Sequence, residues 1–175
     1  DKYNELGYRD AVIVVDSITP YDDRTVDVYM RIEEGDKYYV RDITWVGNTI
    51  YLSDYLSAKL RMKKGDVYNQ KLLNERLSSD DDAIGNEYYN QGYVFYQLDP
   101  VEVNIDGDSI DLEMRIMEGP QATLNRVTIN GNDRLYENVV RRELRTKPGD
   151  LFNKDAIERS YREIAQMGHF NPENI

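Results

Sequence analysis

The chain contains an internal repeat with a period of 84 residues. Residues 40–69 align with residues 124–153, and nine of these 30 positions are identical. Residues 26–35 align with residues 110–119, with six of ten positions identical. Many identities fall on glycine, asparagine and aspartate at expected turns, where the backbone restricts the residue type. A repeat of this length favours several small cores over one continuous core.

One complete unit, residues 36–119, has the expected order strand, helix, helix, strand, strand. We predict a strand at 38–46, helices at 52–60 and from Asn69 to about Asn90, and strands at 93–105 and 109–117, with Ser53 and Asn69 as N-caps. Along the last strand, apolar Ile110, Leu112, Met114 and Ile116 alternate with charged residues. The sheet therefore has one apolar face, and both helices are expected to pack on it.

The second helix of the complete unit carries about eight extra residues near 78–85. Gly92 follows Asn69 by 23 residues, whereas Gly168 follows Asn153 by 15. Because two helical turns take about seven residues, an elongated helix would keep its apolar phase. An excursion loop is the alternative, since the segment contains Gly85 and a Ser-Asp run.

The remaining segments are the two halves of a unit. Residues 1–35 contain a helix end and two strands, and residues 120–175 contain a strand and two helices. Together they have about the length of one unit without its insertion. We therefore expect that the chain comes from a longer array and that the halves complete each other between neighbouring molecules.

Composition excludes several classes of function. With 33 acidic and 22 basic residues the net charge is −11, which is unsuited to a duplex nucleic-acid surface. No apolar run reaches the 18 residues of a membrane-spanning helix. The absence of cysteine excludes disulfides and thiol catalysis, and a single histidine excludes a multi-histidine metal site. No cofactor is expected.

Three further features have a structural and a functional interpretation. Asp80, Asp81 and Asp82 are consecutive, so on a helix they point in different directions, which favours a solvated face over a calcium site. His169 takes the position of Tyr8 and Tyr93 and is interpreted as a structural aromatic, because no nucleophile or orienting acid accompanies it. The 15 tyrosines are expected mainly in the shallow cores, with a low-specificity client surface as the alternative.

The order of these motifs resembles the polypeptide-transport-associated (POTRA) repeat, found in the periplasmic arrays of outer-membrane β-barrel assembly factors. The resemblance is carried by Gly47-Asn48, Lys64-Gly65-Asp66, Asn69, Tyr89-x-x-Gly92-Tyr93 and Glu118-Gly119, and it covers essentially the whole chain. It implies an α+β fold of tandem β-α-α-β-β units, each a three-stranded mixed sheet with two antiparallel helices on one face.

The resemblance also implies a function without a chemical reaction. It predicts a scaffold on the periplasmic side of the outer membrane that receives unfolded outer-membrane proteins and docks accessory lipoproteins, with a β-barrel expected after this segment. It places the last strand centrally and the middle strand at an edge, where a client strand can add. Pro100 supports the edge independently, because proline within a sheet is confined to edges or bulges. The predicted docking residues are Val94, Phe95, Tyr96, Gln97 and Leu98; a merely protected edge is the alternative.

A second candidate surface is basic. Arg141, Arg142 and Arg145 fall in the expected first helix of the last unit and form either a partner-docking patch or a solvated helix face. An exported spacer or adhesion repeat without client binding is the alternative function for the whole chain. The edge strand discriminates between the two, because only an assembly scaffold should bind unfolded client segments there.

Overall fold

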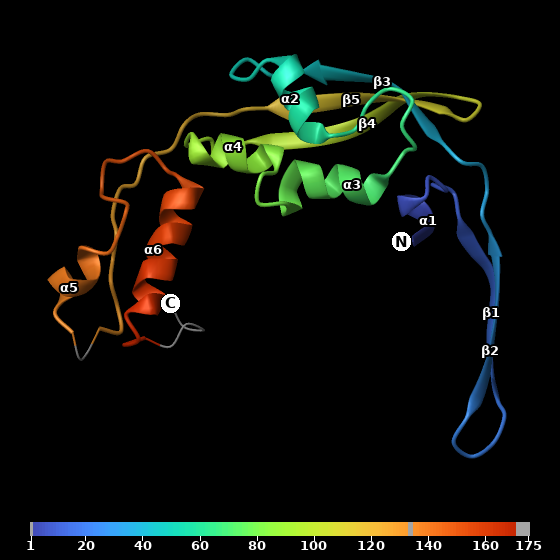
Figure 1. Ribbon diagram of the computed structural model, residues 1–175, viewed down its shortest axis with the longest axis horizontal. Helices are drawn as coiled ribbons and strands as arrows, with labels where there is room; N and C mark the ends of the chain where they lie inside the picture. The colour runs from blue at the N-terminus through green and yellow to red at the C-terminus, as the bar shows by residue number, and fades with distance from the viewer. Residues whose placement is uncertain (1, 133–134, 171–175) are drawn as a thin grey trace. The chain divides into compact units, whose positions relative to one another are not determined.

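The computed structural model describes residues 2–132 and 135–170, which form an α+β fold (Figure 1). The chain separates into two compact units, one formed by residues 1–83 and 98–115 and the other by residues 84–97 and 116–175.

A three-stranded mixed sheet forms the centre of the first unit. Its strands β3 (Tyr39–Val46), β4 (Gln97–Asp106) and β5 (Ser109–Met117) have the order β3-β5-β4, so the last strand is central. β3 runs parallel to β5, with Ile43 opposite Leu112. On β5, apolar residues are buried and alternate with charged ones, as predicted. The two-residue period therefore gives this sheet one buried face.

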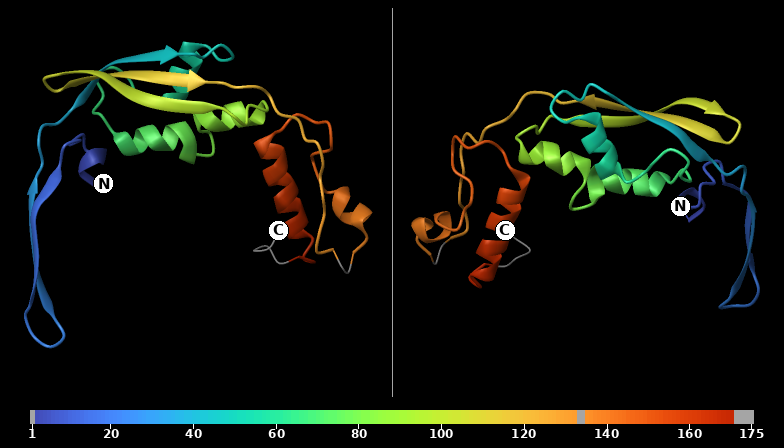
Figure 2. Two further views of the ribbon diagram at one scale, coloured as in Figure 1. Left: turned by 180° about the vertical axis from the view of Figure 1, so that it is seen from behind. Right: turned by 45° about the horizontal axis from the view of Figure 1, so that its top comes forward.

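Helices α2 (Ser53–Leu60) and α3 (Gln70–Asn74) lie along one face of this sheet (Figure 2). α2 buries Leu56 and Leu60 completely. The Asn69 side chain accepts a hydrogen bond from the Leu72 amide at 2.8 Å, which confirms the predicted N-cap of α3. The predicted cap at Ser53 is wrong, because Leu52 takes the N-cap position and makes no side-chain cap.

The second helix of the complete repeat is interrupted rather than elongated. α3 continues into the π-helical turn η1 (Glu75–Ser79), and residues 80–83 then leave the helical path. Helix α4 (Ile84–Asn90) begins after this break. The excursion alternative is therefore correct for the insertion near residues 78–85. A π-helical turn is one way for a helix to absorb extra residues.

Strands β1 (Val12–Pro20) and β2 (Val26–Glu33) form a separate antiparallel hairpin after the short helix α1 (Lys2–Glu5). Every residue of both strands is exposed. The contrast with the sequence-equivalent strand β5 is large: Val28 is 56% exposed, whereas its counterpart Leu112 is 1% exposed. The same apolar pattern is thus present in both repeats, but its side chains are buried only in β5.

The second unit contains α4, α5 (Glu137–Arg141) and α6 (Lys154–Gln166). Asn153 caps α6 by accepting from the Ala156 amide at 2.8 Å, as the repeat predicts. The strand expected near the start of residues 120–175 forms no ladder within residues 120–132; Thr123 there makes an isolated bridge with Leu151. Within residues 2–132 and 135–170, no helix has the length and apolar character needed to cross a bilayer.

Candidate functional site

The predicted client-binding strand lies at an edge of the sheet. In the part of the chain that the structure describes, β4 pairs with β5 on one side and with no strand on the other. Pro100 lies within β4, consistent with the expectation that it occupies an edge strand. Val103 and Ile105 further along β4 are 48% and 42% exposed. This edge therefore carries both unpaired backbone and accessible apolar side chains.

The strand begins later than predicted. β4 begins at Gln97, so Gln97 and Leu98 are in the strand, whereas Val94, Phe95 and Tyr96 lie in the preceding segment. There the Val94 amide donates to the Gly92 carbonyl at 3.0 Å, and the Tyr96 amide donates to the Tyr93 carbonyl at 3.3 Å. Because these amides are already bonded locally, they cannot donate to an added strand.

A cluster of tyrosines holds this segment in its turn. The Tyr96 ring stacks on Tyr88, with ring centroids 4.3 Å apart, and packs edge-on against Tyr89 at 6.2 Å. The Tyr88 hydroxyl donates to Glu118 at 3.2 Å. The Tyr96 hydroxyl is buried and has no hydrogen-bond partner among the described residues, and burial raises its pKa. The cluster supports the structural interpretation of these tyrosines.

The opposite edge of the sheet is partly closed. At the start of β3, the Val40 amide donates to the Asp66 carbonyl at 2.9 Å and the Val40 carbonyl accepts from the Gly65 amide at 2.7 Å. Tyr39 makes a further antiparallel bridge with Val67. The loop before α3 thus occupies the first part of the β3 edge, which leaves β4 as the less obstructed edge.

Glu102 ties β4 to the loop before α3 and to the preceding half-repeat, a role that the sequence did not reveal. Its carboxylate accepts from the Tyr68 hydroxyl at 3.0 Å and pairs with Arg9 at 2.7 Å. Burial, together with this carboxylate, raises the pKa of Tyr68. Arg9 and Glu102 lie far apart in the sequence, so no local motif connects them. These contacts fix the middle of the edge strand in place.

A second polar network crosses the hairpin end of the sheet. Arg41 on β3 makes two hydrogen bonds to Asp111 on β5, at 2.8 and 2.6 Å, and one to Asp106 on β4 at 3.1 Å. The pKa of Asp111 is lowered, chiefly by the hydrogen bond from Arg41. One guanidinium therefore connects all three strands.

Each arginine of the predicted patch forms an ion pair with a different glutamate. Arg141 pairs with Glu137, Arg142 with Glu143 at 2.9 Å, and Arg145 with Glu163 at 2.7 Å. Only Arg141 lies in α5; Arg142 is its C-cap and Arg145 lies beyond the helix, which corrects the predicted placement on a single helix. With each positive charge paired, the surface is less basic than its sequence suggests.

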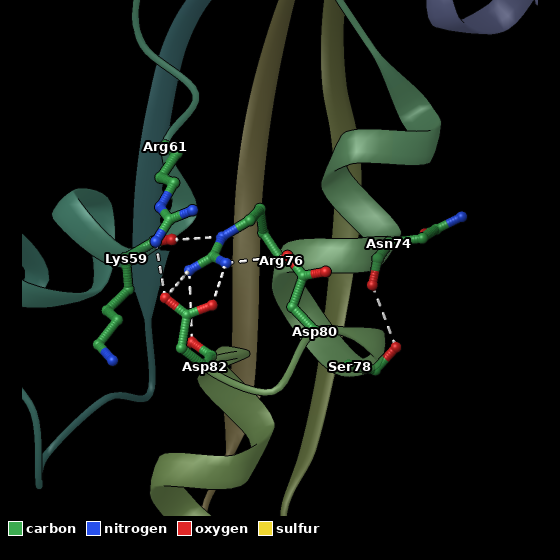
Figure 3. Close-up of polar contacts among 7 residues, drawn as sticks. All are labelled: Lys59, Arg61, Asn74, Arg76, Ser78, Asp80 and Asp82. Atoms are coloured by element: carbon green, nitrogen blue, oxygen red, sulfur yellow. Dashed lines mark hydrogen bonds and ion pairs between the residues drawn. The ribbon is translucent and has the colours of Figure 1, made fainter.

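The acidic run of the insertion surrounds a buried arginine. Arg76 is 1% exposed and donates to the Lys59 carbonyl at 2.8 Å and to Asp80 and Asp82 at 2.9 and 2.5 Å (Figure 3). Arg61 also pairs with Asp82, at 2.7 Å. Two of the three aspartates therefore form ion pairs instead of a simple solvated face. Among the described residues there is no acidic or histidine cluster able to hold a metal ion.

The importance of Arg76 can be inferred from the sequence by comparing it with its counterpart in the next repeat. Its counterpart in the last repeat is Ser160, which is also buried and accepts from the Arg145 amide at 2.8 Å. Arg76 bonds the last turn of α2 through the Lys59 carbonyl, whereas Ser160 bonds Arg145, which follows α5. The larger side chain occurs in the repeat that also carries the extra aspartates, so the insertion supplies counter-charges for Arg76.

Two matches to a protein-family model cover most of the chain. The model, POTRA (surface antigen variable number repeat), matches residues 38–119 and residues 122–174. The chain belongs to the POTRA family. The predicted β-α-α-β-β repeat, with its central last strand, is therefore confirmed as a POTRA fold.

Named relatives and a solved structure agree with this POTRA assignment. A candidate outer membrane protein assembly factor of Treponema pallidum (strain Nichols) is 26% identical over 97% of the chain, and the BamA of Neisseria meningitidis serogroup B is 25% identical over 98%. The chain spans 20% and 21% of these curated relatives. The crystal structure of Haemophilus influenzae BamA POTRA3-5 has a TM-score of 0.77 and 22% identity, covering 98% of this chain and 67% of that one. This likeness concerns the fold.

Proposed function

We propose that the chain is a scaffold segment on the periplasmic side of the bacterial outer membrane, where it takes part in assembling outer-membrane β-barrel proteins. Its relatives named as assembly factors support this assignment, and so does its membership of the POTRA family. The proposed role is binding without catalysis. The observation that carries it is the outer edge of β4, which pairs with no further strand among the described residues, beside a central β5.

The proposed client site is the outer edge of β4, from Gln97 to Ile105. An unfolded outer-membrane segment would add there as a fourth strand through backbone hydrogen bonds. Pro100 has no amide hydrogen, so it interrupts any such ladder and limits its length. The exposed side chains of Val103 and Ile105 would contact alternate apolar residues of the client.

Photocrosslinking discriminates this scaffold from an inert spacer. A photoreactive amino acid is placed at Gln97 or Val103 on the β4 edge, and at Arg115 on central β5 as the matched control. The probe is a synthetic strand with alternating aromatic and polar residues, like a membrane β-strand. Strong crosslinks at both β4 positions and weak ones at Arg115 are expected. Equal, weak yields at all three would favour the exported spacer or adhesion repeat.

Accessory subunits are proposed to dock on a separate surface that includes Arg141, Arg142 and Arg145. Because Glu137, Glu143 and Glu163 already pair with these arginines, an acidic partner must displace internal carboxylates. Such exposed pairs contribute only about 0–1 kcal/mol each, so the exchange is energetically feasible. Binding by purified accessory lipoproteins should then weaken when all three arginines are replaced by glutamine.

A further inference from the structure

The same backbone arrangement closes both boundaries between consecutive repeats. At the first boundary the Gly7 carbonyl accepts from the Tyr38 amide at 2.9 Å; at the second the Gly92 carbonyl accepts from the Ala122 amide at 2.8 Å. Both glycines have positive φ, 94° and 85°. The first boundary lies within one compact unit and the second within the other, so each can be described separately.

The two boundaries continue alike into the next repeat. The Tyr38 carbonyl accepts from the Tyr68 amide and the Ala122 carbonyl accepts from the Phe152 amide, both at 2.9 Å. Each of these amides precedes an asparagine N-cap, Asn69 or Asn153, that begins the second helix of that repeat. The end of one repeat is therefore attached at the helix start of the next.

The side chains across the boundaries differ in chemistry. At the first boundary, Lys71 donates to Glu5 at 3.1 Å, an ion pair in which Lys71 also lies 3.9 Å from Glu75. At the second, with Gly7 aligned on Gly92, the position of Glu5 is taken by Asn90, and that of Lys71 is taken by Asp155. There the neutral Asn90 side chain accepts from the Asp155 backbone amide at 2.9 Å.

The second boundary contains two more amide contacts of the same kind. The Asn153 side chain donates to the Asn90 carbonyl at 2.9 Å, and Lys154 donates to the Asn86 side-chain oxygen at 2.7 Å. Asn86 is buried. An asparagine of one repeat thus supplements the N-cap of the helix in the next repeat, where the free amides need acceptors.

We propose that the pairs Glu5–Lys71 and Asn90–Asp155 form a docking code that determines which repeat ends can adjoin. Exchanged neighbours are disfavoured, because Glu5 opposite Asp155 would bring two carboxylates together at a helix start. Asn90 opposite Lys71 would remove the closer of its two carboxylate partners and leave Glu75 at 3.9 Å. The partner of each surface is therefore a neighbouring repeat with the matching side chain.

Spin labels can test this code, because the chain has no cysteine of its own. Labels at Gln97 and Arg162 span the second boundary, and labels at Thr19 and Asp54 span the first; each pair lies within one compact unit. Distance distributions are measured by double electron–electron resonance in the otherwise unmodified 175-residue chain. Asn90→Glu creates the mismatched pair, and Asn90→Glu with Asp155→Lys transplants the first boundary's ion pair to the second.

The code predicts that one substitution broadens the distance distribution at the second boundary and that a second substitution restores it. Asn90→Glu should increase the population outside the main distance peak about two- to fivefold, the range expected for an exposed charge pair. The double variant should return the distribution to that of the starting chain. Asn130→Glu, at an exposed residue of the following repeat, is the matched control and should change nothing. No broadening by Asn90→Glu, or no rescue by Asp155→Lys, would overturn the code.

Salt and a substitution at the first boundary provide a second test. Raising NaCl to 1 M screens exposed charges to about 3 Å, so the first boundary should broaden while the amide-bonded second boundary does not. Lys71→Asp, which places the second boundary's residue opposite Glu5, should broaden the first boundary at low salt. Equal salt responses at the two boundaries would contradict the assignment of ionic and neutral chemistry.

Discussion

Arg76 donates from both terminal nitrogens to the carboxylate of Asp82, at 2.5 and 3.2 Å, although its own side chain is 1% exposed. The Asp82 side chain is 45% exposed and also forms an ion pair with Arg61, whose side chain is 62% exposed. One carboxylate thus pairs with a buried and with an exposed arginine. The two arginines allow the effect of burial to be separated from that of charge.

Arg76→Ala should lower the free energy of unfolding by about 2–3 kcal/mol, because the buried stem and the charged hydrogen bonds are lost together. Arg61→Ala removes a partner of the same aspartate and should have an effect of about 0–1 kcal/mol. Urea unfolding followed by the fluorescence of Trp45, the single tryptophan, measures both. Equal losses in the two variants would show that burial of Arg76 is not the stabilising feature.

Acid should weaken the first unit through its arginine-paired aspartates. The pKa of Asp111 is lowered chiefly by the hydrogen bond from Arg41, and that of Asp82 chiefly by the one from Arg76. An unfolded aspartate titrates at about pH 3.9, so below that the unfolded state binds more protons than the folded one. This stabilisation is present above about pH 3.9 and is lost as the pH falls towards the lower folded pKa.

Urea unfolding at several pH values tests the contribution of Asp111. The difference in unfolding free energy between the starting chain and Asp111→Asn should be greatest near pH 6 and should shrink steadily below pH 4. Asp99→Asn, at an exposed residue of β4, serves as the control and should leave the pH profile unchanged. A difference that stays constant from pH 6 to pH 3 would refute the linkage.

The repeat could be predicted because its turns leave strong local signals. Gly47-Asn48 recurs as Gly131-Asn132, and in both the asparagine side chain donates to a carbonyl three residues ahead, Tyr51 or Leu135. Such short-range geometry depends on few residues. The alternation along β5 likewise required only the two-residue period of a strand.

The start of β4 could not be predicted from local preference. Tyr93-Val94-Phe95-Tyr96 is rich in strand-forming residues, which favours extended structure. Stacking of Tyr96 on Tyr88, together with local bonds to Gly92 and Tyr93, holds the segment in a turn instead. Contacts with residues outside the segment therefore override its strand propensity. The break after η1 has a similar cause, because Arg76 forms an ion pair with Asp82 across it.

The buried hydroxyl of Tyr96 predicts an unusual response to substitution. Tyr96→Phe removes a polar atom that has no partner among the described residues, so stability should stay constant or rise by up to about 1 kcal/mol. Tyr88→Phe removes the hydrogen bond to Glu118 and should cost about 0.5–1.5 kcal/mol. Urea titrations followed by circular dichroism compare the two, and a loss in Tyr96→Phe as large as in Tyr88→Phe would contradict the prediction.

Gly92 should be far less tolerant of alanine than Gly149, although both have positive φ, 85° and 94°. A left-handed conformation costs a side-chain-bearing residue about 1–2 kcal/mol, and both variants share this term. A β-carbon on Gly92 would also lie 2.3 Å from the Leu151 side chain and 3.3 Å from the Ala122 carbonyl oxygen, whereas one on Gly149 meets nothing within 4 Å. Leu151 can rotate away, but the carbonyl belongs to the bond that closes the boundary. The loss of unfolding free energy, measured by calorimetry, should therefore be about 1–3 kcal/mol larger in Gly92→Ala than in Gly149→Ala, the usual range for overpacking. Equal losses would mean that the boundary relaxes around the added methyl group.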